Sequence, residues 1–173
     1  PDSFSDGGKF NTPEAAAAHV TQMIEDGADI IDLGVESTRP GCTPLTADEE
    51  IERLAQLIDP VLHASTVPVS IDTYHAKTAD YALSKGAHIL NDIWGLHYDP
   101  DMAAIAAKYK VPVIIMHNSN DTNYGDIIED MKAYFFYAVD KALKVGITPQ
   151  QIWLDPGIGF FGKTEEQRSE EHT

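Results

Sequence analysis

Five short apolar runs, separated by segments that carry helix signals, constrain the fold of this chain more than any other feature. The runs are residues 28–34, 67–72, 88–92, 111–117 and 151–155. Brief runs with few polar residues are typical of strands buried on both faces of a parallel sheet. Helices between such strands make βα units, so the alternation predicts an α/β fold.

The segments between the runs carry start and stop signals for helices. Thr12 before Pro13 is a typical N-cap, and Thr46 with Glu49 three residues later makes a capping box. The predicted helices are 13–27, 47–59, 75–86, about 101–110 and about 126–145. A group of acidic residues is expected to form a solvated first turn of the second helix, where the helix dipole favours negative charge. These residues are Asp48, Glu49, Glu50 and Glu52.

Polar segments follow the apolar runs and distinguish between two parallel folds. These segments are ESTRPG, IDTYH, LNDIWG, MHNSN and DPGIGF. An open doubly wound sheet gathers ligand groups at one switch point, whereas a barrel gathers them from all its strands. We therefore favour a (β/α)8 TIM barrel. Eight strands need about 250 residues, so a chain of 173 residues predicts a barrel truncated at both ends, with about strands 2 to 6 present.

Charge and composition exclude several classes of partner. The chain has 12 Lys and Arg against 28 Asp and Glu, a formal net charge of −16, which argues against a nucleic-acid partner. No apolar run approaches the roughly 20 residues of a membrane helix, so no membrane partner is expected. A single cysteine, Cys42, excludes an internal disulfide and suits a reducing compartment such as the cytoplasm.

Three strand-end residues form the main candidate site. Asp72 and Asp155 each end an apolar run, and Asn91 is the first polar residue at the end of another. Any one of them alone is better explained as a helix cap. Together they predict a polar ring at the mouth of a barrel, where such folds bind ligands. A carboxylate there can accept two parallel N–H bonds from an amino-substituted nitrogen heterocycle.

Two further motifs admit competing interpretations. Arg39 is either an exposed loop arginine or part of a loop that contacts an anion. Residues 157–164 match G-x-x-x-x-G-K-T, the phosphate-binding P-loop. Only nine residues follow that match, and two phenylalanines stand where backbone amides would wrap a phosphate, so we interpret it as a chance match. The histidines show no metal-binding spacing.

Read in order, several blocks resemble those of the dihydropteroate synthases, enzymes of the bacterial folate pathway. The blocks are PDSFSDGG, DLGVESTRPG, SIDTYHA, ILNDIWG and DPGIGF. The resemblance runs from residue 1 to about residue 167. It implies condensation of 6-hydroxymethyl-7,8-dihydropterin pyrophosphate with p-aminobenzoate, giving 7,8-dihydropteroate and pyrophosphate. Pyrophosphate would leave first, and the arylamine would then attack a pterin methylene cation.

The resemblance also implies a role for each matching residue. The residues implied to bind the pterin are Asp72, Asn91, Met116 and Asp155. Asp72 is in addition an implied catalytic residue that stabilises the cation. The residues implied to bind p-aminobenzoate are Phe4, Thr38, Arg39, Pro40 and Phe160. Asp6 is the second implied catalytic residue, a loop acid that helps to organise pyrophosphate and the Mg²⁺ cofactor. The family's main Mg²⁺ ligand, an asparagine, would lie before Pro1.

Several expectations about the whole protein follow from the resemblance. The complete protein is expected to be a cytoplasmic homodimer and a sulfonamide target. Residues 168–173, RSEEHT, resemble a translated sequencing adapter, so the expected pterin-binding domain is 1–167. The chain by itself is expected to be inactive, because a truncated barrel has two unpaired sheet edges.

Three alternatives stay open at this point. The first is the pterin-binding module of a methyltetrahydrofolate corrinoid methyltransferase, which shares IDT, LND and DPG but should lack PDSFSDGG and ESTRPG. The second is a P-loop nucleotide-binding protein, based on residues 157–164. The third is a non-catalytic interaction domain, which leaves the polar strand ends unexplained.

Overall fold

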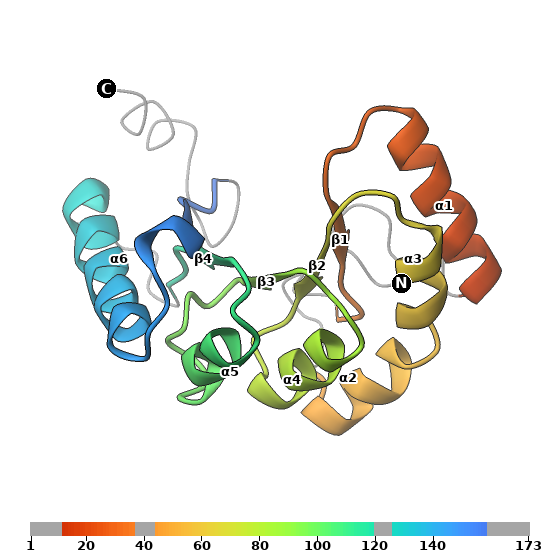
Figure 1. Ribbon diagram of the computed structural model, residues 1–173. Coiled ribbons are helices and arrows are strands. Elements are labelled where there is room, and N and C mark those ends of the chain that lie inside the picture. Colours follow the sequence, from red (N-terminus) through yellow and green to blue (C-terminus); the bar gives the residue numbers. More distant parts are fainter. Residues whose placement is uncertain (1–11, 37–43, 120–125, 159–173) are drawn as a thin grey trace. The chain divides into compact units, whose positions relative to one another are not determined.

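The computed structural model describes residues 12–36, 44–119 and 126–158. The chain divides into two compact units, which meet in sequence at Asn91 and Asp92. Helices separate successive strands along the described residues (Figure 1). No helix in these three ranges is both long and apolar enough to cross a membrane.

The first unit contains three parallel strands and the helices that connect them. Its elements are α1 (Pro13–Glu25), β1 (Ile31–Leu33), α2 (Ala47–Leu54), α3 (Ile58–Ala64), β2 (Val69–Asp72), α4 (Ala76–Ser84) and β3 (Ile89–Asp92). β2 pairs with β1 on one side, where Asp32 faces Ser70, and with β3 on the other, where Asp72 faces Asn91. Helix α1 packs beside α3, and α2 packs beside α4 (Figure 1).

The second unit contains two parallel strands and their helices. Its elements are α5 (Met102–Tyr109), β4 (Val113–Met116), α6 (Ile127–Lys144), a 3₁₀ helix (Pro149–Gln151) and β5 (Ile152–Asp155). β4 and β5 pair along their whole length, and the last pair in the register is Met116 with Asp155. Helix α5 packs against α6.

The predicted caps form as expected. The Thr12 hydroxyl accepts a hydrogen bond from the Ala15 amide at 3.2 Å. Thr46 and Glu49 make a reciprocal capping box at the start of α2. Beyond the ends of α1 and α4 the chain turns at Gly27 and Gly86, whose φ angles of +100° and +107° are rarely adopted by residues with a Cβ atom.

One predicted helix is wrong in its extent. The segment 47–59 is expected to be continuous, but α2 ends at Leu54 and α3 starts at Ile58. Pro60 explains the break, because its ring would clash with the carbonyl four residues earlier and it has no N–H to donate. In the first turn of a new helix that missing N–H leaves no hydrogen bond unmade.

The core confirms that the middle strand is buried on both faces. In β2, Val69, Ser70 and Ile71 are each 1% exposed. In β1 only one face is buried, since Ile31 and Leu33 are buried and Asp32 is exposed. In β5 the apolar Trp153 and Leu154 are 43% and 50% exposed. The prediction of burial on both faces therefore holds for β2 and fails for β1 and β5.

Candidate functional site

Asp72 and Asn91 lie side by side at the carboxyl ends of β2 and β3. They are register partners in the parallel pair, and both are half-buried. Gly34, just after β1, makes room for Asp72, since a Cβ atom built on Gly34 would lie 3.1 Å from Asp72 Oδ2. The structure therefore brings these two predicted site residues together, as expected for adjacent strand ends.

Asp32 joins this arrangement, although the sequence did not indicate it. Its carboxylate accepts a hydrogen bond from the Ser70 hydroxyl and another, at 3.1 Å, from Asn91 Nδ2. Although the residue as a whole is exposed, partial desolvation of its carboxylate raises the pKa of Asp32 above its ordinary value, while the bonds from Ser70 and Asn91 lower that pKa. The available signal was an aspartate in the middle of the apolar run 28–34.

These residues share one face of the first unit's sheet. Register places Asp32 beside Ser70 and Asp72 beside Asn91. Ser70 and Asp72 are two residues apart in β2, so their side chains leave the sheet on the same face. The first unit therefore presents two carboxylates and an amide on one polar surface near the strand ends.

In the second unit Met116 and Asp155 are register partners at the ends of β4 and β5. Met116 is 3% exposed, and Asp155 is half-buried. Two main-chain amides hold Asp155 in place. Its carbonyl oxygen accepts a hydrogen bond from the His117 amide, and its Oδ1 accepts one from the Gly157 amide, both at 2.8 Å. The amide of Gly157 therefore serves the turn after β5, whereas a P-loop would direct it at phosphate.

Asp92 holds the loop after β3 in a fixed turn. It is fully buried, and its carboxylate accepts from the amides of Trp94 and Leu96 at 2.9 and 2.8 Å. Burial is the main cause that raises the pKa of Asp92 to about 6, against an ordinary value of 3.8. The Tyr134 hydroxyl donates to the Trp94 carbonyl at 2.6 Å. The aspartate of the LND motif is thus a structural residue of this loop.

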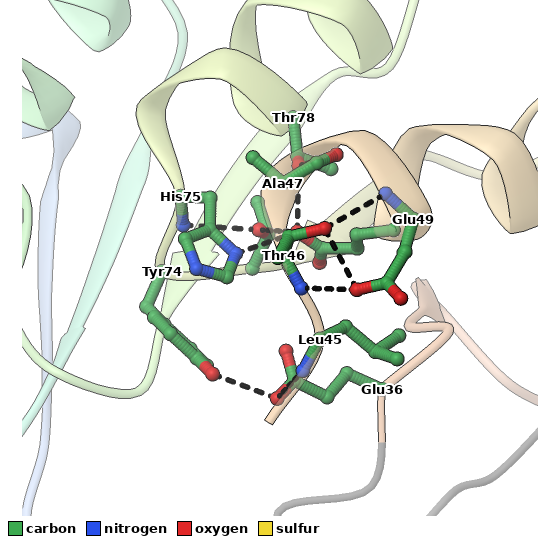
Figure 2. A network of polar contacts seen from close by, with 10 residues as sticks. Glu36, Leu45, Thr46, Ala47, Glu49, Tyr74, His75 and Thr78 are labelled. Carbon is green, nitrogen blue, oxygen red and sulfur yellow. Dashed lines mark hydrogen bonds and ion pairs between the residues drawn. The ribbon is translucent and has the colours of Figure 1, made fainter. Parts of the chain in front are cut away.

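A second polar network lies between α2 and α4 of the first unit (Figure 2). Glu50 is 1% exposed, and its Oε2 accepts from the hydroxyls of Thr73 and Thr78 at 3.0 and 2.6 Å and lies 2.9 Å from His75 Nδ1. The expectation that Glu50 belongs to a solvated turn is therefore wrong. It faces inward because its carboxylate has three polar partners there, whereas Asp48, Glu49 and Glu52 remain exposed.

Glu36 lies at the edge of this network. Its Oε1 accepts from the Tyr74 hydroxyl at 2.7 Å and from the Leu45 amide at 3.2 Å (Figure 2). One ligand atom each from Glu36, Glu50 and His75 lie within 4.8 Å of one another. Glu36 Oε1 and Glu50 Oε2 already accept hydrogen bonds, and the bond from Thr78 to Glu50 links α4 to α2.

Several predicted site residues lie outside the described residues. They are Phe4, Asp6, Thr38, Arg39, Pro40 and Phe160. The same is true of Cys42 and of most of the P-loop match at 157–164. Their predicted roles remain predictions.

Polar side chains at the carboxyl ends of parallel strands, over a buried apolar layer, are typical of α/β proteins that carry their ligand sites at this edge of the sheet. Residues 1–171 match the pterin binding enzyme family. The chain belongs to this family.

Individual relatives agree with this assignment. Dihydropteroate synthase from Clostridium beijerinckii is 50% identical over 170 residues, which cover 98% of this chain and 63% of the relative. The Bacillus subtilis enzyme is 48% identical, over 92% of this chain and 56% of the relative. The chain therefore spans about three fifths of the length of these relatives.

Solved structures show the same fold. Dihydropteroate synthase from Clostridium difficile, crystallised in the presence of pteroic acid, matches with a TM-score of 0.87 and 46% identity over 96% of this chain and 64% of that one. The Xanthomonas albilineans enzyme with 4-aminobenzoic acid matches with a TM-score of 0.85 and 34% identity over 96% and 61%. The resemblance to dihydropteroate synthases is thus confirmed, and so is the partial (β/α)8 barrel.

Proposed function

We propose that the protein containing this chain is a dihydropteroate synthase, which condenses 6-hydroxymethyl-7,8-dihydropterin pyrophosphate with p-aminobenzoate. The observation that carries the proposal is the pairing of Asp72 with Asn91 at adjacent strand ends, in a chain of the pterin binding enzyme family. The Clostridium difficile and Xanthomonas albilineans relatives were crystallised with pteroic acid and 4-aminobenzoic acid, which supports these substrates.

We propose the following division of roles among the residues of this chain. Asp72, Asn91, Met116 and Asp155 are the residues that we propose contact the pterin. The carboxylates accept hydrogen bonds from its amino group and ring N–H groups, the pairing that suits acceptor-only oxygens. Met116 provides apolar contact with the ring.

Charge stabilisation explains the first chemical step. When the bond to pyrophosphate breaks, positive charge develops on the pterin methylene group. A fixed carboxylate such as Asp72 stabilises that charge without reorganising during the reaction. The arylamine of p-aminobenzoate then attacks the methylene carbon and loses a proton. Phe4, Thr38, Arg39, Pro40 and Phe160 are the residues that we propose hold p-aminobenzoate.

Mg²⁺ would neutralise pyrophosphate as it leaves, and Asp6 is its proposed contact in this chain. Among the described residues the one metal-compatible group is Glu36, Glu50 and His75. Mg²⁺ prefers about six oxygen ligands in an octahedron, several of them water. A group with an imidazole and an already hydrogen-bonded carboxylate does not fit that ion, so no step is assigned to it.

The proposal extends to the location, the oligomeric state and the inhibitors of the whole protein. We propose that the complete protein is a cytoplasmic homodimer. We also propose that sulfonamides compete with p-aminobenzoate, since the Yersinia pestis relative was crystallised in a sulfonamide drug complex.

A chimera tests the function. Residues 1–167 would replace the matching segment of the Clostridium beijerinckii relative, and formation of dihydropteroate would be measured from both substrates. We expect turnover, and we expect Asp155→Ala to lower kcat/KM at least about 100-fold. Asp101→Ala, the same change at an exposed position of the second unit, is the matched control and should leave turnover unchanged. A folded chimera without product, or full activity in Asp155→Ala, would contradict the proposal.

A further inference from the structure

The two hydrogen bonds of the Asp32 carboxylate link all three strands of the first unit. Asp32 lies on β1 and Asn91 on β3, and β2 pairs with both strands. One carboxylate oxygen, Oδ1, accepts from the Ser70 hydroxyl on β2. The other, Oδ2, accepts from Asn91 Nδ2 at 3.1 Å. Both oxygens of Asp32 are therefore engaged within the sheet.

The chemistry of the two groups fixes which way the Asn91 amide faces. An ionised carboxylate only accepts hydrogen bonds, whereas an asparagine amide has one donating and one accepting end. The donating end of Asn91 must therefore face Asp32. Its carbonyl oxygen, Oδ1, then faces away from Asp32 and can only accept a hydrogen bond.

We infer that Asp32 is a positioning residue that holds Asn91 Oδ1 ready to accept a hydrogen bond from a ring N–H of the pterin. This inference rests on the proposed function, because it takes Asn91 to be a pterin ligand. Asp32 itself acts through Asn91 and touches no reacting atom. Ser70, 1% exposed, anchors the opposite oxygen and so limits rotation of the carboxylate.

Without this constraint the amide could turn by half a rotation and present its NH₂ group to the ligand. Two donors would then face each other, and one hydrogen bond to the pterin would be lost. Loss of one hydrogen bond weakens binding by about tenfold. The loss is confined to the substrate that Asn91 binds, so KM for the pterin should rise while KM for p-aminobenzoate should not.

The test compares Asp32→Ala and Asp32→Asn in the chimera described above. In Asp32→Asn the new amide oxygen can still accept from Asn91 Nδ2, and its NH₂ can donate to the Ser70 hydroxyl, which both donates and accepts. Asp29→Ala and Asp29→Asn make the same changes three residues earlier, at an exposed position. The measurements are KM for each substrate, kcat and the melting temperature.

We expect Asp32→Ala to raise KM for the pterin pyrophosphate about tenfold while KM for p-aminobenzoate stays unchanged. Asp32→Asn should restore most of the loss, and the Asp29 variants should match the parent. Three results would overturn the inference: equal loss in Asp32→Asn, equal changes in both KM values, or no change in Asp32→Ala. An inactive parent chimera would overturn the proposed function, and this inference with it, whereas an active parent isolates the role of Asp32.

Discussion

Gly34 lies against Asp72 so closely that a Cβ atom on Gly34 would be 3.1 Å from Asp72 Oδ2 and 3.3 Å from its Cβ. Both distances are tighter than ordinary van der Waals contact. A side chain at position 34 would therefore move the carboxylate that we propose stabilises the pterin cation.

Gly34→Ala should lower kcat/KM of the chimera about tenfold with little change in stability, because a displacement of a few tenths of an ångström misplaces a charge-stabilising group. Steady-state kinetics measures the effect. The control is a double-mutant cycle with Asp72→Ala. If Gly34→Ala acts through Asp72, it should add nothing to the loss already caused by Asp72→Ala, and additive losses would contradict this explanation.

Gly95→Ala should destabilise the protein far more than Gly146→Ala. Both glycines have positive φ, +54° and +95°, which costs a residue with Cβ about 1 kcal/mol. At Gly146 nothing lies within 4 Å of the added atom, but at Gly95 the Met116 carbonyl oxygen would lie at 2.7 Å and a Tyr134 ring carbon at 2.8 Å. We expect the free energy of unfolding to fall about 2 kcal/mol further in Gly95→Ala than in Gly146→Ala. Urea unfolding measures both, and equal losses would show that the turn adapts.

Relative to the Asp92→Asn variant, the parent protein should be more stable in acid than at neutral pH, because Asp92 titrates in this range. Its pKa is raised to about 6 in the folded protein, from an ordinary value of 3.8. Between these values the folded state holds the proton more tightly than the unfolded state, so stability falls as the pH rises from about 4 to about 6.

The full difference is on the order of 3 kcal/mol. Asp92→Asn cannot titrate, so the free energy of unfolding of the parent should decline relative to this variant across that interval. Urea unfolding at several pH values measures the difference. A relative gain in parent stability with rising pH would contradict the assignment.

Glu50→Gln should lower the free energy of unfolding by about 2 kcal/mol, because one buried oxygen serves two threonine hydroxyls and lies against the His75 ring. The amide oxygen of glutamine can take the place of this oxygen, but it is a weaker acceptor than a carboxylate oxygen, because hydrogen bonds to charged groups are the stronger ones. Glu52→Gln is the matched control on the same helix, at an exposed position. Equal stability of the two variants in thermal or urea unfolding would contradict the proposed importance of the network.

The pairing of Asp72 with Asn91 could be predicted from sequence because strand ends carry a clear signal. An apolar run that stops at a polar residue marks both the end of a strand and the edge of the sheet where it lies. Parallel pairing then aligns those ends. The capping box of Thr46 and Glu49 could be predicted for a different reason, since its two partners are three residues apart and need no tertiary information.

Asp32 and Glu50 could not be predicted in this way, because their partners are distant in sequence. Asp32 lies within a run whose other residues indicate a buried strand. Only its hydrogen-bond partners, Ser70 on β2 and Asn91 on β3, show why a carboxylate belongs there. Glu50 occurs among acidic residues that do face solvent. Its burial depends on Thr73, His75 and Thr78, which only the packing of α4 against α2 brings near.

The hydrogen bonds of Asp32 join residues 38 and 59 positions apart in the chain. They can form only after three strands and the segments between them have assembled, so the orientation of Asn91 belongs to the folded state alone. A ligand that binds this oriented amide binds the native state in preference to the unfolded chain. Saturating pterin should therefore protect the first unit against unfolding, and the protein's resistance to heat would follow the supply of its substrate.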